Sequence, residues 1–221
     1  MKSITPAQLA LAAPRLGPAD LAAWADALSR AAQVAGIDTA EEWAHWLGQL
    51  AHESAGFTVL QENLNYSARR LTQVWPRRFP SLAAAQPFAM NPEALANRVY
   101  NGRMGNRPES PDGYWFRGRG PKQLTGRDNY TAFNAWCREN KLLAQGQDIR
   151  LEPDVLLRPQ WGALSAAWFW STNNLGAILD RLDGEAACRA VTKRINGGTI
   201  GLADRWNRTR VLLKAFGGPG A

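Results

Sequence analysis

Residues 39–54 read TAEEWAHWLGQLAHES and carry a strong helix signal. Thr39 with Glu42 three positions later is a capping box, which marks a helix start. The apolar residues of this stretch recur at the spacing of one helix face; they are Trp43, Trp46, Leu47, Leu50 and Ala51. We therefore expect a helix from Thr39 to about Ser54, with these side chains facing the core.

The same signals predict helices along most of the chain. Thr5 and Gln8 form another capping box with Pro6 in the first turn, and a helix over residues 18–35 should stop at Gly36. Further helices are expected at residues 67–75, 91–100, 129–140, 160–171, 185–195 and 202–216. Residues 101–125 hold five glycines and three prolines, so helix is not expected there. The sequence predicts a mainly α fold, with two helical lobes around a substrate cleft and a small irregular or β-containing insertion.

Composition is that of an ordinary globular protein. The 221 residues fit one domain, and 45% hydrophobic with 20% charged residues are typical values. Cys137 and Cys188 lie in expected helices and are predicted to be reduced core thiols. No stretch approaches the roughly 18 apolar residues of a membrane span. Pro14 ends the apolar run 9–13, so an export signal is not expected either.

The chain is basic, with a formal net charge of +7. Such a charge favours polyanionic partners, among them nucleic acid, anionic lipid and the carboxylates and phosphates of a bacterial envelope. The arginines are scattered rather than clustered, so a solvated surface accounts for most of them.

Two glutamates could perform acid and base chemistry. Glu53 follows Leu50 by three positions and so falls near the apolar stripe, where partial burial would favour the protonated form that a general acid needs. The alternative is a surface residue at a frayed helix end. Glu62 lies nine positions later, beyond the Gly56 turn, so the chain can fold back to present it across a gap. Two carboxyls across a sugar are the minimal apparatus of glycoside hydrolysis.

Other active-site patterns are not supported. His52-Glu53 is not followed by the second histidine of a zinc helix, because position 56 is glycine. The chain has no Gly-x-Ser-x-Gly elbow, and its glycine-rich loop lacks the ending of a phosphate cradle. We therefore expect no metal and no cofactor. Trp115, in that loop, is expected to be exposed and to stack on a sugar or a base, whereas core packing explains the tryptophans on helical stripes.

A set of ordered blocks resembles glycoside hydrolase family 19. The blocks are AHES at residues 51–54, ENLNYS at 62–67, GRGPKQLT at 118–125, NY at 129–130, INGG at 195–198 and ADR at 203–205. They span most of the chain, and together they are far more specific than any one of them.

The resemblance implies a role for each matching residue. Glu53 would be the general acid, Glu62 the general base acting on a water at the opposite face of the sugar, and Thr125 a hydroxyl that holds this water. Amides expected to contact substrate are Gln123, Asn129 and Asn196, and Tyr66 and Trp115 are also expected to bind it. Arg205 would support the carboxylates and the substrate; placed near Glu62, it would keep that base ionised.

The second block looks like the phage and prophage endolysin branch, and the chain lacks the disulfide cysteines of plant chitinases. This branch implies an α+β lysozyme-like fold and inverting hydrolysis of peptidoglycan between N-acetylmuramic acid and N-acetylglucosamine. We expect a single catalytic domain over residues 1–221, without a separate wall-binding domain, that acts as a monomer. It would wait in the host cytoplasm and reach the wall through a membrane pore, without stable membrane insertion.

Other functions remain open at this point. A chitinase of the same family would use the same residues, and a non-catalytic protein would only bind the glycan. A basic nucleic-acid-binding protein is suggested by the charge and the aromatic residues. Because Glu53, Glu62 and Thr125 are all present, hydrolysis is favoured over binding alone, and nucleic acid is not the expected partner.

Overall fold

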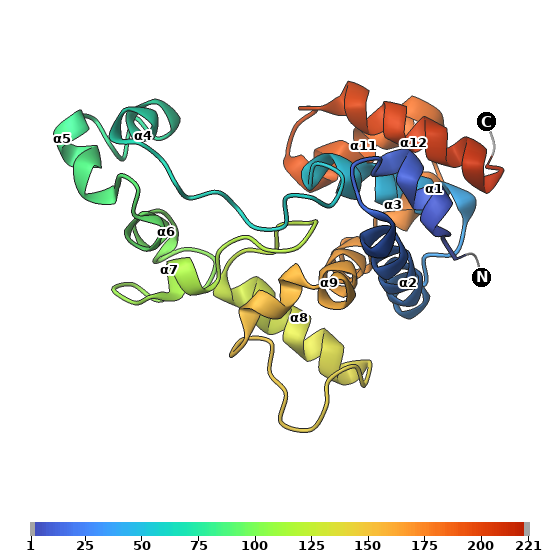
Figure 1. The fold of residues 1–221 in the computed structure, drawn as a ribbon, viewed down its shortest axis with the longest axis horizontal. Helices are drawn as coiled ribbons and strands as arrows, with labels where there is room; N and C mark the ends of the chain where they lie inside the picture. Colours follow the sequence, from blue (N-terminus) through green and yellow to red (C-terminus); the bar gives the residue numbers. More distant parts are fainter. Residues whose placement is uncertain (1–2, 219–221) are drawn as a thin grey trace. The chain divides into compact units, whose positions relative to one another are not determined.

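The computed structural model describes residues 3–218, which form helices joined by turns (Figure 1). Two compact units share the chain. Unit 1 comprises Met1–Leu60, Gly120–Gln123 and Asp154–Ala221, and unit 2 comprises Gln61–Arg119 and Leu124–Pro153. The chain therefore passes from one unit to the other four times.

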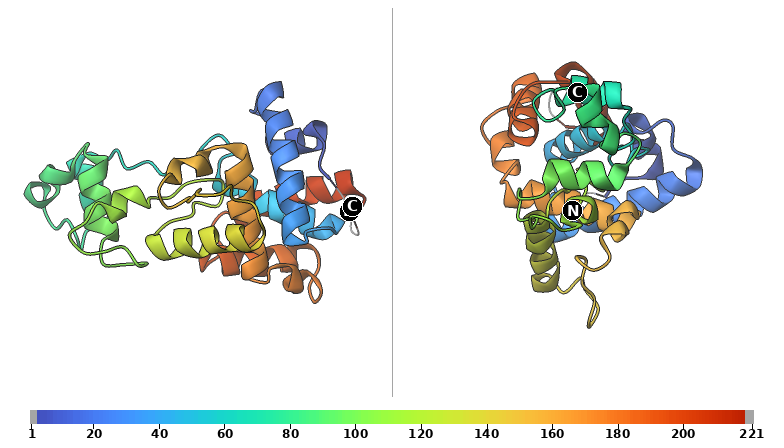
Figure 2. Two further views of the ribbon diagram at one scale, coloured as in Figure 1. Left: turned by 90° about the horizontal axis from the view of Figure 1, so that it is seen from below. Right: turned by 90° about the vertical axis from the view of Figure 1, so that its left-hand side faces the viewer.

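The helices of unit 1 come from both ends of the chain. They are α1 (Pro6–Ala12), α2 (Pro18–Ala35), α3 (Ala40–Glu53), α9 (Pro159–Thr172), α10 (Gly176–Leu179), α11 (Gly184–Asn196) and α12 (Leu202–Phe216). A 3-10 turn, η2 (Pro153–Leu157), leads into α9. Helix α3 packs along α12, and α2 packs along α9, so the N-terminal and C-terminal thirds build one core (Figures 1 and 2).

Helix α3 lies at the centre of this core. Its residues 43–51 are all buried, including Trp43, Trp46 and Leu50, as the apolar stripe predicted. The predicted capping box is also present, because Thr39 accepts from the backbone of Glu42 at 3.1 Å. Burying these large side chains holds the C-terminal end of α3 in a fixed position.

Unit 2 has its own small core. Its helices are α4 (Ala68–Val74), α5 (Leu82–Ala85), α6 (Pro92–Tyr100), α7 (Asp112–Trp115) and α8 (Arg127–Glu139), with the 3-10 turn η1 (Gln86–Phe88). Helices α4 to α6 and the segments between them bury Leu64, Leu71, Phe79, Ala85, Leu95, Ala96 and Val99. Helix α7 packs closely on α6 because residue 113 is glycine: a Cβ there would lie 2.6 Å from the Ala96 carbonyl oxygen.

All the long helices predicted from the sequence are present. The short elements α5, η1, η2 and α10 were missed, because one turn contains too few residues to show a period. Residues 101–125 are mostly irregular as expected, apart from the single turn α7, and hold antiparallel bridges between Arg119 and both Gln61 and Leu124. Cys137 and Cys188 are buried and free, which confirms the predicted core thiols. Among residues 3–218, no helix is long and apolar enough to cross a membrane.

Candidate active site

Glu53 is the last residue of α3, and a buried arginine holds its carboxylate. Arg205 of α12 donates from Nη2 to Glu53 Oε1 at 2.5 Å. The Glu53 side chain is 23% exposed and the Arg205 side chain 2%. Within residues 3–218, no group donates to the second oxygen, Oε2. Glu53 thus has one oxygen anchored in the protein and one available for chemistry.

A chain of buried hydrogen bonds fixes Arg205. Its Nη1 donates to Gln49 Oε1 at 2.6 Å, and Gln49 Nε2 donates to Thr192 Oγ1 at 3.0 Å. Thr192 in turn donates to the Cys188 carbonyl oxygen at 2.7 Å. Residues of three helices, α3, α11 and α12, therefore position the guanidinium. A buried network is rigid when each of its polar groups has a hydrogen-bond partner.

The close approach of α3 and α12 depends on Gly48. A Cβ at this position would lie 2.3 Å from Thr209 Oγ1 and 3.1 Å from its backbone nitrogen. Any larger residue would push the two helices apart. Gly48 thus places Arg205 within reach of Gln49 and Glu53.

His52, next to Glu53, pairs with Asp204 of α12. Its Nδ1 lies 2.7 Å from Asp204 Oδ2, and Arg208 donates to the same oxygen at 2.8 Å. Burial raises the pKa of Asp204, but the hydrogen bonds from Arg208 and His52 outweigh it, so the net pKa is lowered. The histidine ring also packs over Gly201, where a Cβ would lie 2.3 Å from it.

In unit 2, both carboxylate oxygens of Glu62 accept hydrogen bonds. Oε1 accepts from the backbone N–H of Gly118 at 2.6 Å, and Oε2 accepts from the Tyr100 hydroxyl at 2.7 Å. The Glu62 backbone N–H also donates to the Gly118 carbonyl oxygen at 3.1 Å. The donors come from two segments of unit 2, α6 and the loop that carries Gly118, and they hold the carboxylate in one orientation.

Tyr100 is a permanent donor to Glu62. Burial, the negative charge of Glu62 and the hydrogen bond to it all raise the Tyr100 pKa well above its ordinary value. The phenol therefore stays protonated at any pH near neutrality, and Glu62 always has a neutral partner.

Buried arginines shape the loop that carries Gly118. Arg119 is 1% exposed and donates from Nη1 to the carbonyl oxygens of Trp115 and Arg117 and to the Tyr130 hydroxyl. The Tyr130 hydroxyl donates to the Arg117 carbonyl oxygen at 3.1 Å. The arginine of the GRG block and the tyrosine of the NY block are therefore internal supports.

The other predicted substrate contacts are divided between the units. In unit 2, Asn129 Nδ2 donates to the Thr125 carbonyl oxygen at 2.7 Å, and the half-buried Tyr66 ring packs 5.4 Å from that of Trp75. In unit 1, Gln123 has φ +56° and donates to the Gly120 carbonyl oxygen. Asn196 ends α11 and is exposed. Their contacts with substrate stay predictions.

Trp115 is exposed, as its place in the glycine-rich loop predicted. Trp115 lines a hollow of about 360 Å³ on the surface of unit 2. Other residues that line this hollow are Arg107, Arg127, Arg150 and Leu151. These arginines are already paired: Asp112 accepts from the first two, and Asp148 from the third. Burial raises the pKa of Asp112, but the bonds from Arg127 and Arg107 hold it well below the usual range. Stacking of a sugar on Trp115 stays a prediction.

Two expectations about the carboxylates are corrected. The sequence predicts Arg205 beside Glu62, whereas Arg205 pairs with Glu53, because α12 packs along α3 in unit 1. The Arg205 guanidinium is also buried, with its two terminal nitrogens bonded to Gln49 and Glu53. Its contact with a carboxylate is therefore a structural support inside unit 1. The frayed-end alternative for Glu53 is wrong, because its side chain is largely buried and paired. That Glu53 and Glu62 face each other stays a prediction.

Three residues that hold the carboxylates were not predicted from the sequence. Gly48 and Gln49 lie in a helix for which only the apolar residues were used to predict structure. A glycine inside a helix is a signal of close packing and could have identified Gly48. Tyr100 was taken only as a helix end. No sequence signal links it to Glu62, 38 residues away.

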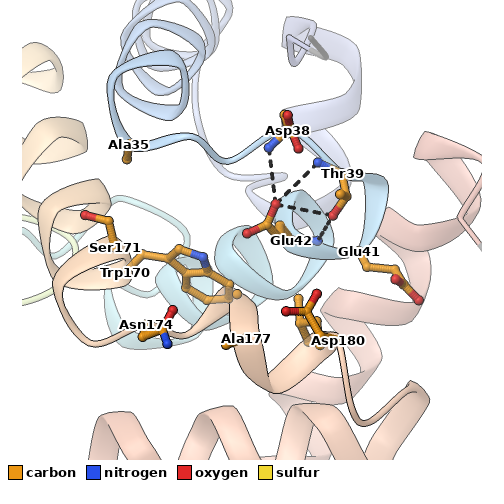
Figure 3. Close-up of a pocket in the computed structure, with 12 residues that line it drawn as sticks. Ala35, Asp38, Thr39, Glu41, Glu42, Trp170, Ser171, Asn174, Ala177 and Asp180 are labelled. Carbon is orange, nitrogen blue, oxygen red and sulfur yellow. Dashed lines mark hydrogen bonds between the residues drawn. The ribbon is translucent and has the colours of Figure 1, made fainter.

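Figure 3 shows a pocket of about 460 Å³ in unit 1, and Glu53 is not among its lining residues. It is bounded by the N-terminal turn of α3 and by α10, and Glu42 lies eleven residues before Glu53, roughly 16 Å along the helix. Its charged lining consists of Asp38, Glu41, Glu42 and Asp180. Four carboxylates repel an anionic polymer, so we do not assign the glycan to this pocket.

Comparison with known proteins points to one family. A glycosyl hydrolase family 19 domain-containing protein of Haemophilus influenzae is 37% identical over 188 residues, which cover 85% of this chain and 86% of the relative. No protein-family model matches the chain.

Solved structures share the fold. Chitinase C from Streptomyces griseus matches with a TM-score of 0.63 at 18% identity, covering 97% of this chain and 93% of that one. A chitinase C mutant matches with a TM-score of 0.61 at 16% identity and the same coverage. These structures confirm the expected mainly helical, lysozyme-like fold.

Proposed function

The chain belongs to glycoside hydrolase family 19, and from this we propose that it is an endolysin that hydrolyses peptidoglycan. The bond cut would be the β-1,4 linkage between N-acetylmuramic acid and N-acetylglucosamine. The observation that carries this proposal is the contrast between two carboxylates: Glu53 is held by a cation through one oxygen, whereas Glu62 is held by neutral donors through both.

Glu53 is proposed as the general acid. Because Arg205 donates to Oε1, the proton of the acid form resides on the unpaired Oε2, which faces no competing donor within residues 3–218. When this proton passes to the glycosidic oxygen, a carboxylate forms next to the guanidinium. A charge that develops during the reaction beside a fixed cation is stabilised without any movement of the protein.

Glu62 is proposed as the general base. Its two hydrogen bonds fix the plane of the carboxylate, and both come from neutral donors, so no cation competes with the water for its charge. Thr125 would hold this water. The sugar would then be attacked on the face opposite to the leaving group, and the anomeric centre would be inverted.

Chitin is the second candidate substrate. The same two carboxylates would cut its β-1,4 bonds, and the chain shares the fold of chitinase C. The basic net charge favours peptidoglycan, because the wall carries carboxylates and phosphates that chitin lacks.

The expected mode of action follows from this function. We propose that the protein acts as a monomer on the wall, that it reaches the wall from the host cytoplasm through a membrane pore, and that neither nucleic acid nor a cofactor takes part. A phage or prophage origin would suit the ENLNYS block at residues 62–67.

Purified peptidoglycan and colloidal chitin, each incubated with the wild type and with Glu53→Gln, test the proposal. Mass spectrometry of borohydride-reduced products identifies the new reducing end. Peptidoglycan fragments ending in N-acetylmuramic acid, absent with the variant, are expected. Fragments from chitin alone would assign the second candidate, and equal cleavage by wild type and variant would refute the role of Glu53.

A further inference from the structure

A short strap, Gly120–Gln123, is fixed on α9 of unit 1. The Gly120 N–H donates to the Leu60 carbonyl oxygen at 2.8 Å, and a Cβ at Gly120 would lie 3.2 Å from Ser165 Oγ. Pro121 is buried, and its Cδ would lie 3.1 Å from a Cβ at Gly162. The backbone on the N-terminal side of Lys122 therefore has little freedom.

Lys122 presents a half-buried cation that contacts no carboxylate in the described part of the chain. Its Nζ lies 4.3 Å from the centre of the Phe169 ring. No residue between 3 and 218 accepts a hydrogen bond from this ammonium or forms an ion pair with it. An ammonium has three donors, and leaving all of them without an acceptor in a partly buried position is unfavourable.

The charge of Lys122 acts in the surroundings of Glu53. Burial lowers the pKa of Lys122, the negative charge of Glu53 raises it, and the positive charge of Arg205 lowers it again. All three residues belong to unit 1. The ammonium is therefore within electrostatic range of the Glu53 carboxylate, on the same unit of the protein.

We propose that Lys122 is a specificity-determining residue that binds the lactyl carboxyl group of the N-acetylmuramic acid unit next to the bond that Glu53 cleaves. This inference rests on the proposed function. The lactyl ether at O3 is the feature that distinguishes N-acetylmuramic acid from N-acetylglucosamine. Its free carboxylate is an anionic acceptor for an ammonium, and when a peptide is attached the remaining amide carbonyl oxygen is a neutral, weaker acceptor. Chitin offers no group of this kind, so Lys122 would favour the wall polymer.

Lys122 could instead act on Glu53 alone, as a second cation beside the acid. The two roles predict different results, because an effect on the acid reduces cleavage of every substrate by the same factor. An effect on the lactyl group reduces cleavage only of substrates that carry its carboxyl oxygens.

Two matched substrates separate these roles: peptide-free peptidoglycan glycan strands, and the same strands after the lactyl carboxyl groups have been reduced to alcohols. The quantity measured is the ratio of kcat/KM for the acid strands to kcat/KM for the reduced strands. For the wild type we expect a ratio of roughly ten or more, as for loss of one charged hydrogen bond. The loss should appear mainly in KM, since the contact is present before and during the reaction.

The variants are Lys122→Met, which keeps the stem over Phe169 without the charge, Lys122→Arg, which keeps the charge, and Lys214→Met as an exposed control on α12. The ratio should fall to about one in Lys122→Met, be largely retained in Lys122→Arg, and be unchanged in Lys214→Met. A ratio that Lys122→Met leaves at the wild-type value, or a wild-type ratio of one, overturns the inference while the proposed function stands. Failure of the wild type to cleave either strand would instead remove the proposed function.

Discussion

Arg205 and Glu53 are 152 positions apart in the sequence, yet Nη2 of the first donates to Oε1 of the second at 2.5 Å. The guanidinium is buried, and its Nη1 is bound to Gln49. Arg205 thus joins α12 to α3 at the point where α3 presents its terminal carboxylate. It supports both the packing of unit 1 and the proposed proton transfer.

Replacing Arg205 should therefore damage activity and stability together. Arg205→Met would leave Gln49 and Glu53 without their cationic donor, and we expect the free energy of unfolding to fall by roughly 2 to 4 kcal/mol. Hydrolysis should fall at least a hundredfold in kcat, because the forming carboxylate loses its stabilising charge. Urea unfolding and initial rates check both. Arg210→Met, exposed on the same helix, should behave as the wild type; equal effects of the two variants would contradict this role.

Gly48→Ala tests whether helix spacing positions Arg205. The new Cβ would collide with Thr209 and force α3 away from α12, so we expect a loss of about 1 to 3 kcal/mol in stability. The value of kcat should fall by more than the small fraction of unfolded protein can explain, since Arg205 would move relative to Glu53. Gly17→Ala, where a Cβ meets nothing within 4 Å, is the control for a glycine substitution. A Gly48→Ala protein with wild-type kcat would show that the spacing is not needed.

Tyr100→Phe removes one donor to Glu62 while keeping the ring. Without the hydroxyl the carboxylate can rotate, and kcat is expected to fall about tenfold with little change in KM. The midpoint of thermal unfolding should change little, because the ring still packs against the small core of unit 2. Steady-state kinetics on soluble glycan strands measure the split. An increase in KM alone would assign Tyr100 to substrate binding instead.

His45 makes stability depend on pH. Burial lowers its pKa from 6.5 to about 4, so between these values the unfolded chain binds a proton that the folded chain does not. The free energy of unfolding is therefore not reduced by His45 above pH 6.5, and it falls by at most about 3 kcal/mol as the pH drops from 6.5 towards 4. The lowered pKa values of Asp112 and Asp204 act only below this window, near and under 3.8.

Urea unfolding of the wild type and His45→Phe at pH 7 and pH 4.5 measures this effect. His45 Nδ1 has no hydrogen-bond partner within the described chain, so phenylalanine is a close substitute. The variant should lose less stability than the wild type between the two pH values. The same loss in both proteins would exclude His45 as the cause.

The sequence predicted local structure well for a physical reason. Helix starts such as Thr39 depend on groups three residues apart, and the stripe of α3 depends on residues one turn apart. Glu53 and Glu62 could also be found, because they lie in short blocks typical of the family.

Contacts between distant segments could not be predicted in the same way. The partner of Arg205 depends on how α12 packs on α3, and a helix pattern shows only which face is buried. The donors to Glu62 come from α6 and from the Gly118 loop, which no periodicity relates. The division into two units is equally hidden, because the strap Gly120–Gln123 belongs to unit 1 while its neighbours belong to unit 2.

The central claim is that Glu53 gives a proton to the leaving oxygen while Glu62 activates a water on the other face of the sugar. Proton NMR of soluble peptidoglycan strands during the first minutes of hydrolysis tests it directly, because the new reducing end appears before mutarotation. The account predicts that the α-anomer appears first and that Glu62→Gln gives no product. Initial release of the β-anomer would show retention and contradict the proposed roles of the two carboxylates.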